Sequence, residues 1–287
     1  MSNSVPLQDG LGDLFGEEMG KGRTLSVALP PGRIILSDEG KGEPALWITE
    51  EPASSDLWTQ LHTEHQRSGL WPLMLSSLSD DYNAGALRPW ESGELYLSLI
   101  SSPDLHDPAA LLAAWWSQYT ESDAESDPLP ETERLAVTAP FGRQWPGLAP
   151  AGVIQADPDV LAGEYAAHLV SRDPSMRLGL VAAGRGADSL SACGWSGPMN
   201  YTNDTGEIAA VVRGWEDRYG VRVVGAGFSE LFLSVAAPPT TLDEALHVAA
   251  EHFALSPDNI WQGQAPYTLA AYAEHLMQLN TWEFWWD

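Results

Sequence analysis

Residues 204–253 read DTGEIAAVVRGWEDRYGVRVVGAGFSELFLSVAAPPTTLDEALHVAAEHF, and their apolar side chains follow two different periods. One set recurs every three or four residues, the period of an amphipathic helix; it comprises Ile208, Val211, Val212, Trp215 and Tyr219. Val221–Val224 is an apolar run, and Leu231–Val235 alternates as in a strand with one buried face. The helical spacing returns after Pro238-Pro239. The stretch therefore predicts a helix, two strands and a second helix.

Local signals mark the ends of these elements. Asp204-Thr-Gly-Glu207 and Thr241-Leu-Asp-Glu244 have the spacing of a capping box, in which two side chains satisfy free backbone N–H groups. Gly220 is expected to end the first helix in a left-handed conformation. Trp282–Trp286 alternates again, which predicts a terminal strand that pairs centrally in the sheet. Together with an apolar strand at Arg177–Ala183, this order predicts an α+β domain, a split βαβ (ferredoxin-like) sandwich with two helices on one face.

The residues upstream predict a mixed α/β domain. Apolar runs at Arg33–Leu36, Ala45–Thr49 and Trp71–Leu75 are typical of strands. A helix is expected across residues 54–69, between a serine cap and a glycine. Another helix is expected after Asp107-Pro108, where an N-cap residue precedes proline.

Composition divides the chain into four segments. Residues 1–24 are rich in glycine and are expected to form a loose arm. Residues 25–120 form the N-terminal mixed α/β domain and residues 135–287 the C-terminal α+β domain. Between them, residues 121–134 carry carboxylates and prolines but little apolar surface, which predicts an extended acidic linker. Within the first domain, Glu94–Ile100 alternates like a strand.

The charge balance restricts the classes of partner. The chain has 287 residues, 40 acidic and 14 basic, and its formal net charge is −26. Such a charge opposes binding to nucleic acid phosphates and to anionic membranes, so neither is an expected partner. It favours solubility, and it would also complement a basic protein. Cys193 is the single cysteine and the N-terminus lacks a signal-peptide pattern, so the cytoplasm is the expected compartment.

Several short strings near the C-terminus occur as a set. They are Arg213–Gly220 (RGWEDRYG), Val235–Pro239 (VAAPP), Ala249–Phe253 (AAEHF), Pro257–Asn259 (PDN) and Trp282–Asp287 (WEFWWD). Over roughly the last 110 residues, this set resembles the bacterial domain-of-unknown-function family 4253, with Gly69–Pro72 as a companion element upstream. The family is uncharacterised, so the resemblance implies a shared fold and supplies no catalytic residues.

The segment 184–205 is predicted to be a long polar loop between a strand and a helix N-terminus, where backbone N–H groups are free. Because loops carry function more often than the scaffold, its side chains are candidate binding residues: Asp188, Trp195, Asn200, Tyr201 and Asn203. Arg213, Glu216 and Asp217 are further binding candidates on the expected outer face of the next helix. We expect Arg213 to pair with both carboxylates. A merely ordered loop and a structural charge network are the alternatives.

Metal, cofactor and nucleophile patterns are incomplete. His247-Val-Ala-Ala-Glu251-His252 invites a metal interpretation but matches neither H-E-x-x-H nor H-x-x-E-H. Gly194-Trp-Ser-Gly197 is not a nucleophile elbow, and Cys193 has no cationic neighbour in sequence to stabilise a thiolate. Gly184-Arg-Gly186 is not followed by the Gly-Lys-Ser/Thr of a phosphate-binding loop. We therefore predict no metal, no cofactor and no catalytic residue.

Charge and the incomplete motifs favour a non-catalytic protein-recognition module, such as an immunity- or antitoxin-like protein for a basic partner. One alternative is a hydrolase-type enzyme whose site lies at the 184–205 loop, with Glu251, His252 or Asp258 nearby. Another is a sensor of a small ligand that binds in the crevice between the two domains. Clustering of the loop residues with these carboxylates in one pocket would favour the enzyme.

Overall fold

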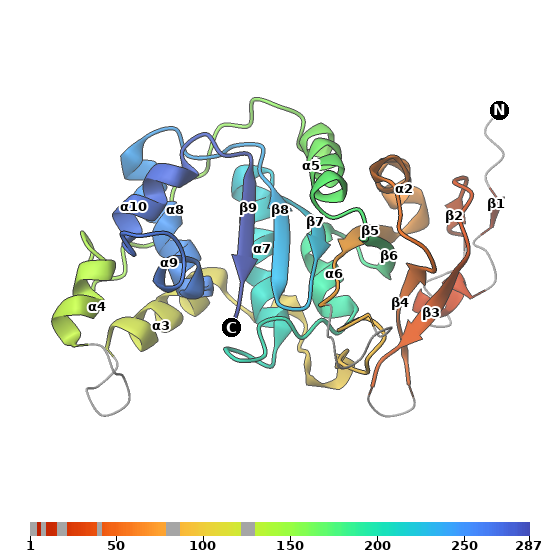
Figure 1. Ribbon diagram of the computed structural model, residues 1–287, viewed down its shortest axis with the longest axis horizontal. Helices are drawn as coiled ribbons and strands as arrows, with labels where there is room; N and C mark the ends of the chain where they lie inside the picture. The colour runs from red at the N-terminus through yellow and green to blue at the C-terminus, as the bar shows by residue number, and fades with distance from the viewer. Residues whose placement is uncertain (1–4, 7–9, 16–21, 39–41, 79–86, 122–129) are drawn as a thin grey trace.

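The computed structural model describes residues 5–6, 10–15, 22–38, 42–78, 87–121 and 130–287. The described strands form a short antiparallel pair, β1 and β2, and a mixed seven-stranded sheet of order β3-β4-β6-β5-β7-β8-β9 (Figure 1). Their bounds are β1 (Val5–Pro6), β2 (Thr24–Leu25), β3 (Gly32–Leu36), β4 (Pro44–Thr49), β5 (Leu70–Leu75), β6 (Arg177–Ala182), β7 (Arg222–Ala226), β8 (Glu230–Ser234) and β9 (Thr281–Trp285).

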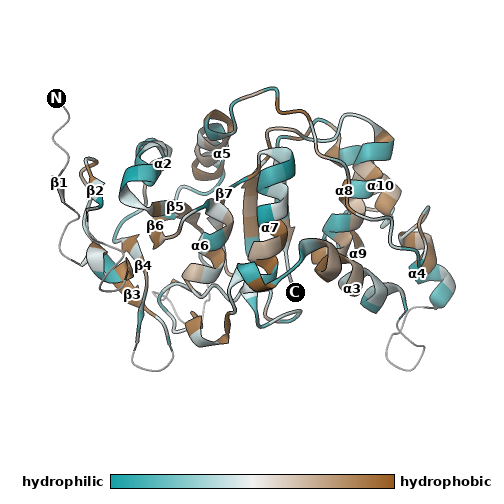
Figure 2. Ribbon diagram, turned by 180° about the vertical axis from the view of Figure 1, so that it is seen from behind, coloured by the Kyte–Doolittle hydropathy of each residue, from teal (hydrophilic) through white to brown (hydrophobic). Residues whose placement is uncertain are grey.

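Helices cover both faces of this sheet, so the protein is α+β. They are η1 (Leu11–Phe15), α2 (Ser55–Ser68), η2 (Leu97–Leu99), η3 (Pro103–Leu105), α3 (Pro108–Thr120), α4 (Glu131–Val137), α5 (Pro158–Arg172), α6 (Gly186–Ala192), α7 (Thr205–Tyr219), α8 (Leu242–Leu255), α9 (Asp258–Trp261) and α10 (Leu269–Leu276). α2 and α5 pack on one face, and Figure 2 shows α6 and α7 across the other. Beyond β9, α3, α4, α8, α9 and α10 form a helical extension (Figure 1).

Alternate residues of one strand serve different cores, as the two-residue period of a strand requires. In β8, Phe232 joins the core beneath α2 and α5, whereas Leu231 and Leu233 join the core beneath α7 and α8. The second core is rich in fully buried tryptophans, including Trp215, whereas the first contains the fully buried Trp58. No helix of the described residues is long and apolar enough to cross a membrane.

Most of the expected helix ends are confirmed. Ser54 caps α2 by accepting from Leu57 N, and Gly69 ends that helix with φ 68°. Thr241 and Glu244 form the expected capping box at the start of α8. Gly220 ends α7 with φ 60°, in the left-handed region that glycine adopts without a steric penalty.

Three local predictions are wrong. Glu94–Ile100 is not a strand but contains the single turn η2, and Tyr96 N donates instead to Gly194 O. The segment 184–205 is not one loop, because α6 forms within it, and most residues of α6 are buried. At α7 the capping box does not form: Asp204 accepts from Gly206 N, but Glu207 binds the Thr202 hydroxyl.

The C-terminal region is not a self-contained sandwich, and the ferredoxin-like arrangement is not confirmed. β5, from far upstream, lies between β6 and β7; it pairs antiparallel with β6 and parallel with β7. Helices also cover both faces of the sheet rather than one. The strands of the two predicted domains therefore share one sheet. The predicted linker lies mostly outside the described residues, but α4 begins within it at Glu131.

The expected terminal strand exists as β9, but its predicted central position is wrong. β9 pairs only with β8 among the described strands and forms an edge of the sheet. The other side of β9 is covered by Asn259, whose side chain accepts from Trp285 N and donates to Glu283 O. The Asn259 amide thus replaces the peptide group of a further strand, which protects an edge that could otherwise pair with another chain.

Candidate functional site

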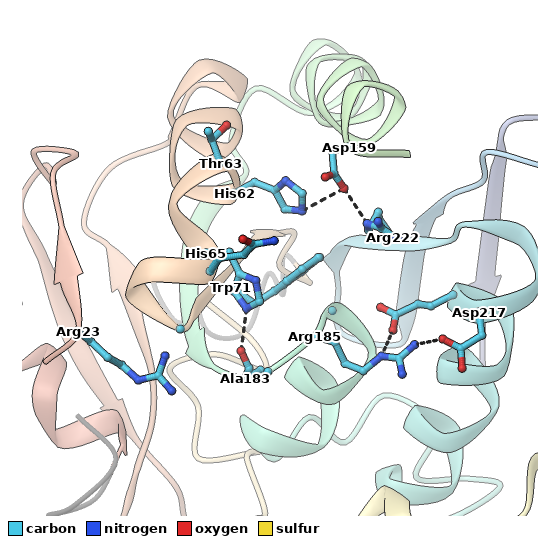
Figure 3. Close-up of a pocket in the computed structure, with 15 residues that line it drawn as sticks. Arg23, His62, Thr63, His65, Trp71, Asp159, Ala183, Arg185, Asp217 and Arg222 are labelled. Carbon is cyan, nitrogen blue, oxygen red and sulfur yellow. Dashed lines mark hydrogen bonds and ion pairs between the residues drawn. The ribbon is translucent and has the colours of Figure 1, made fainter. Parts of the chain in front are cut away.

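A cavity of about 670 Å³ opens where α2 and β6 end and where α6 and β7 begin (Figure 3). Its size is typical of sites for small organic molecules. The charged and aromatic residues that line it are Arg23, His62, His65, Trp71, Asp159, Arg185, Glu216, Asp217 and Arg222. We refer to this cavity as the arginine pocket.

Two glycines allow the walls of the arginine pocket to approach closely. Gly69 has a positive φ, and a Cβ built on it would lie 1.8 Å from Arg23 Nη1. A Cβ on Gly186 would lie 2.6 Å from the Trp71 ring and 2.9 Å from Glu216 Oε1. The helix C-cap at residue 69 and the start of α6 therefore both require glycine for this packing.

The two histidines sit one turn apart on α2 and face the pocket. His65 Nε2 donates to Ala183 O over 2.8 Å, and burial lowers the pKa of His65. His62 stacks on Trp58 and contacts the Trp71 ring edge-on. Burial lowers the pKa of His62 to about 4, so its imidazole is neutral at pH 7. Its buried Nε2 has no hydrogen-bond partner in the described part of the chain, which is unusual for a buried polar atom.

Arg185 and Glu216 form the inner ion pair of the pocket. Glu216 Oε2 accepts from Arg185 Nε, and Glu216 Oε1 accepts from Ala187 N over 2.9 Å. The Glu216 side chain is only 5% exposed, and burial raises its pKa. Removing one partner of a buried ion pair costs about 3–5 kcal/mol. This pair therefore holds α6 against α7 and is not free to open for a ligand.

Arg222 and Asp159 form a second, more accessible ion pair. Arg222 Nε donates to Asp159 Oδ1 over 2.8 Å, and the Asp159 side chain is 55% exposed. Exposed ion pairs contribute only about 0–1 kcal/mol, so this pair can open at small cost. Within the described residues, Nη2 of Arg222 and Nη1 of Arg185 have no hydrogen-bond acceptor. Each can donate to a bound molecule.

The arginine pocket differs in charge from the rest of the protein. Among the residues that the structure describes, three arginines line it, and they are matched by three carboxylates. Its local charge is therefore close to zero with both histidines neutral, in a chain whose formal charge is −26. Guanidinium groups suit carboxylate and phosphate because their planar N–H donors match the two oxygens. Anions are repelled by most of this protein but not by this cavity.

The residues that the sequence singled out are dispersed. Arg213 does not pair with the carboxylates of its own helix; it donates to Asp188 and Asp104, while Asp217 accepts from Arg185. Glu216, which we expected on an outer face, is buried. Of the predicted binding residues, these two carboxylates, Glu216 and Asp217, line the arginine pocket.

The remaining loop candidates lie elsewhere. Trp195 is fully buried and donates from Nε1 to Gly227 O. Tyr201 donates its hydroxyl to Asp258 Oδ2 over 2.7 Å. Asn200 and Asn203 are exposed. The predicted loop is therefore divided between a helix, a core tryptophan and the protein surface.

Glu251, His252 and Cys193, which could act as acid, base or nucleophile, lie in different surroundings. Glu251 is fully buried and accepts from both Arg218 and Trp215. Burial lowers the pKa of His252 to about 3 and raises the pKa of Cys193 to about 12. Among the described residues, no three His, Cys, Asp or Glu side chains are arranged to hold a metal ion.

Ser101 and His106 form a hydroxyl–imidazole pair that the sequence did not suggest. The Ser101 hydroxyl lies 2.5 Å from His106 Nε2. Asp204 lies 3.7 Å from the same Nε2 atom, whereas a catalytic triad places its carboxylate on the other ring nitrogen. Asp204 instead binds Ser101 N and caps α7. Asp204 therefore stabilises the start of α7, and the three side chains are not arranged as a catalytic triad.

Comparison with known proteins supports the predicted resemblance. Residues 177–287 match the family model described as Domain of unknown function (DUF4253). The comparisons with curated proteins and with solved structures found no match. The DUF4253 segment supplies Arg185, Glu216 and Arg222 to the arginine pocket, whereas Arg23 and the two histidines come from upstream. The pocket thus joins both parts of the chain.

The sequence gives little warning of the pocket residues. Arg185 stands only in an incomplete phosphate-loop pattern, and His62 and His65 lie in a stretch that the sequence marks only as a helix. The lining segments lie at residues 23, 62–71, 159, 183–186 and 216–222, and long-range strand pairing brings them together. Two signals are available: Glu216 and Asp217 are among the predicted binding residues, and basic residues are scarce in this chain.

Proposed function

We propose that this protein is a non-catalytic binding protein that holds a small organic anion, bearing a carboxylate or phosphate group, in the arginine pocket. The observation that carries the proposal is a 670 Å³ cavity lined by three arginines and two histidines in a chain of net charge −26. This proposal develops the small-ligand alternative at the crevice between the two parts of the chain.

Binding without catalysis is favoured by the chemistry of the lining. Both histidines have lowered pKa values and are neutral at pH 7, and the described lining contains no serine hydroxyl or thiol. Thr63 is the only aliphatic hydroxyl among the described lining residues, and its hydroxyl donates to Thr59 O. Arginines that are held by carboxylates are suited to orienting an anion.

A thermal-shift screen tests the proposal with a panel of phosphate monoesters and small carboxylates. A ligand present at 100 times its Kd stabilises the folded state by about 2.7 kcal/mol, which corresponds to roughly 5 °C or more. We expect at least one anion to produce this shift. Arg222→Gln should abolish it, and Arg143→Gln should not, because Arg143 pairs with Glu131 on the exposed surface. If no anion stabilises the wild type, the proposal is wrong.

Recognition of a basic protein is the second candidate, and the net charge of −26 is the observation that favours it. Electrostatic association of this kind weakens steeply with ionic strength. Capture of partners from the native host at low and high salt, followed by mass spectrometry, tests it. A basic partner that is retained at low salt and lost at high salt would support this candidate, and capture that does not depend on salt would contradict it.

A further inference from the structure

Asp159 places a carboxylate of the protein itself where a ligand anion would bind. It lies in the first turn of α5, and its side chain extends toward two groups of the pocket wall (Figure 3). Asp159 Oδ1 accepts from Arg222 Nε over 2.8 Å and lies 4.0 Å from His62 Nε2. The distance to His62 is too long for a hydrogen bond.

His62 Nε2 is the second observation that points to a ligand at this position. The His62 side chain is 9% exposed, and its Nε2 is buried without a partner among the described residues. The charged and titratable groups around it are Asp157, which caps α5, Asp159 of α5, Arg222 of β7 and His65 of α2. None of them forms a hydrogen bond with Nε2, so an acceptor from a bound molecule would satisfy it.

Resting on the proposed function, we infer that Asp159 is an internal competitor for the ligand. The ligand is a carboxylate that replaces the Asp159 carboxylate on Arg222 and accepts a hydrogen bond from His62 in its Nε2–H tautomer. The carboxylate class follows from the present occupant, because the Arg222 guanidinium already holds a carboxylate at this place.

The exchange is specific to this ion pair. Glu216 also binds an arginine of the pocket, but it is 5% exposed and accepts from Ala187 N. Displacing it would leave the buried Ala187 N–H and the Nε of Arg185 without their acceptor. Asp159 is 55% exposed, so its carboxylate regains water when it leaves Arg222. Of the two ion pairs, only Arg222–Asp159 can give up its carboxylate to a ligand without leaving a buried polar group unpaired.

Isothermal titration of the full chain with malonate tests this inference. We expect Asp159→Asn to bind malonate about two- to fivefold more tightly than the wild type, because the variant lacks the exposed carboxylate that competes with the ligand for Arg222. Glu164→Gln is the matched control, because it removes one negative charge from the exposed side of the same helix and does not line the pocket. We expect it to change the affinity less than twofold. Asp159→Ser replaces Asn should Asp159→Asn fail to fold, because serine is tolerated in a first helical turn.

The other outcomes overturn the inference in distinct ways. Equal tightening by both variants would mean a general charge effect, and weaker binding by Asp159→Asn would mean that Asp159 positions Arg222 for the ligand. Tightening of inorganic phosphate but not of malonate would contradict the carboxylate class. If malonate binds the wild type and Asp159→Asn with the same affinity, Asp159 does not compete with the ligand. The proposed function would still hold. Absence of binding of either anion to any of these proteins would count against both.

Discussion

Glu251 shows at the residue scale how a polar group is tolerated in the core. Its carboxylate is fully buried and accepts hydrogen bonds from Trp215 Nε1, Ala149 N and both terminal nitrogens of Arg218. Every lone pair that points into the core therefore has a donor, which is the condition for burying a charge. Glu251 and Trp215 both belong to the strings that carry the family resemblance, and their role here is structural.

Replacement of Glu251 should therefore affect folding rather than ligand binding. Glu251→Ala leaves the Arg218 guanidinium without its buried counter-ion, which costs about 3–5 kcal/mol. Urea unfolding should show this loss as a lower midpoint, while Glu274→Ala on the exposed side of α10 should stay within about 0.5 kcal/mol of the wild type. A Glu251→Ala protein of unchanged stability would contradict the buried-pair account.

The buried histidines make stability depend on pH in a defined direction. Burial lowers the pKa of His252 to about 3 and of His62 to about 4, while the unfolded chain titrates near 6.5. Below pH 6.5 the unfolded state therefore binds more protons than the folded state. As the pH is lowered, the free energy of unfolding decreases by up to about 1.4 kcal/mol per pH unit for each histidine. Between pH 6.5 and 5, the stability of His252→Gln, measured by unfolding, should change less with pH than that of the wild type. Equal slopes in the two proteins would contradict the neutral buried state of His252.

At the scale of elements, the aromatic side chains of the terminal strand β9 pack against side chains from outside the sheet. Trp282 and Phe284, which the alternating pattern places on one face, pack against Trp215. Trp286 packs against Trp195 and donates to Leu255 O. The pattern of alternation predicts which face of β9 is buried. It cannot predict the position of β9 in the sheet, because strand order depends on contacts between distant segments.

Truncation of Trp286 should destabilise the protein, because its side chain is 2% exposed. Trp286→Ala removes a large buried aromatic side chain, which costs about 3–5 kcal/mol, and the melting temperature should fall by several degrees. Trp285→Ala is the matched control on the half-buried face of β9. A shift below about 2 °C for Trp286→Ala, small against that expectation, would contradict the packed position.

Asn259 should protect the edge of β9. Asn259→Ala removes the acceptor for Trp285 N and the donor to Glu283 O, which we expect to cost about 1–3 kcal/mol. The uncovered edge should also promote association between chains. Light scattering and thermal melting of Asn259→Ala, with the exposed Asn203→Ala as control, measure both effects. Loss of stability without association would mean that other residues also cover the edge.

At the scale of the whole molecule, one sheet connects the two parts that composition separates. Local patterns are sufficient to predict β4 and β5 from their apolar runs, and α2, α7 and α8 from helical spacing or end signals. They cannot show that β6 pairs between β4 and β5, because this pairing joins residues more than a hundred positions apart. The arginine pocket depends on that pairing, so the sequence could suggest only its separate residues.

Limited proteolysis tests the predicted linker. We expect first cleavage within residues 121–134, because this acidic segment has little apolar surface to bury. The shared sheet predicts that the two fragments remain associated after cleavage, which size-exclusion chromatography would detect. Cleavage first within α2 or α7 would contradict the predicted linker. Separation of the fragments would contradict the account in which both parts of the chain share one sheet.

The most direct test of the central claim is a histidine-detected NMR titration with the most stabilising anion from the thermal-shift panel. His62 and His65 line the arginine pocket, whereas His168 and His247 lie outside it. We expect the ring signals of His62 and His65 to shift in a saturable, one-to-one manner and those of His168 and His247 to stay unchanged. Shifts of all four histidines, or of none of the pocket pair at a saturating concentration, would contradict anion binding in the arginine pocket.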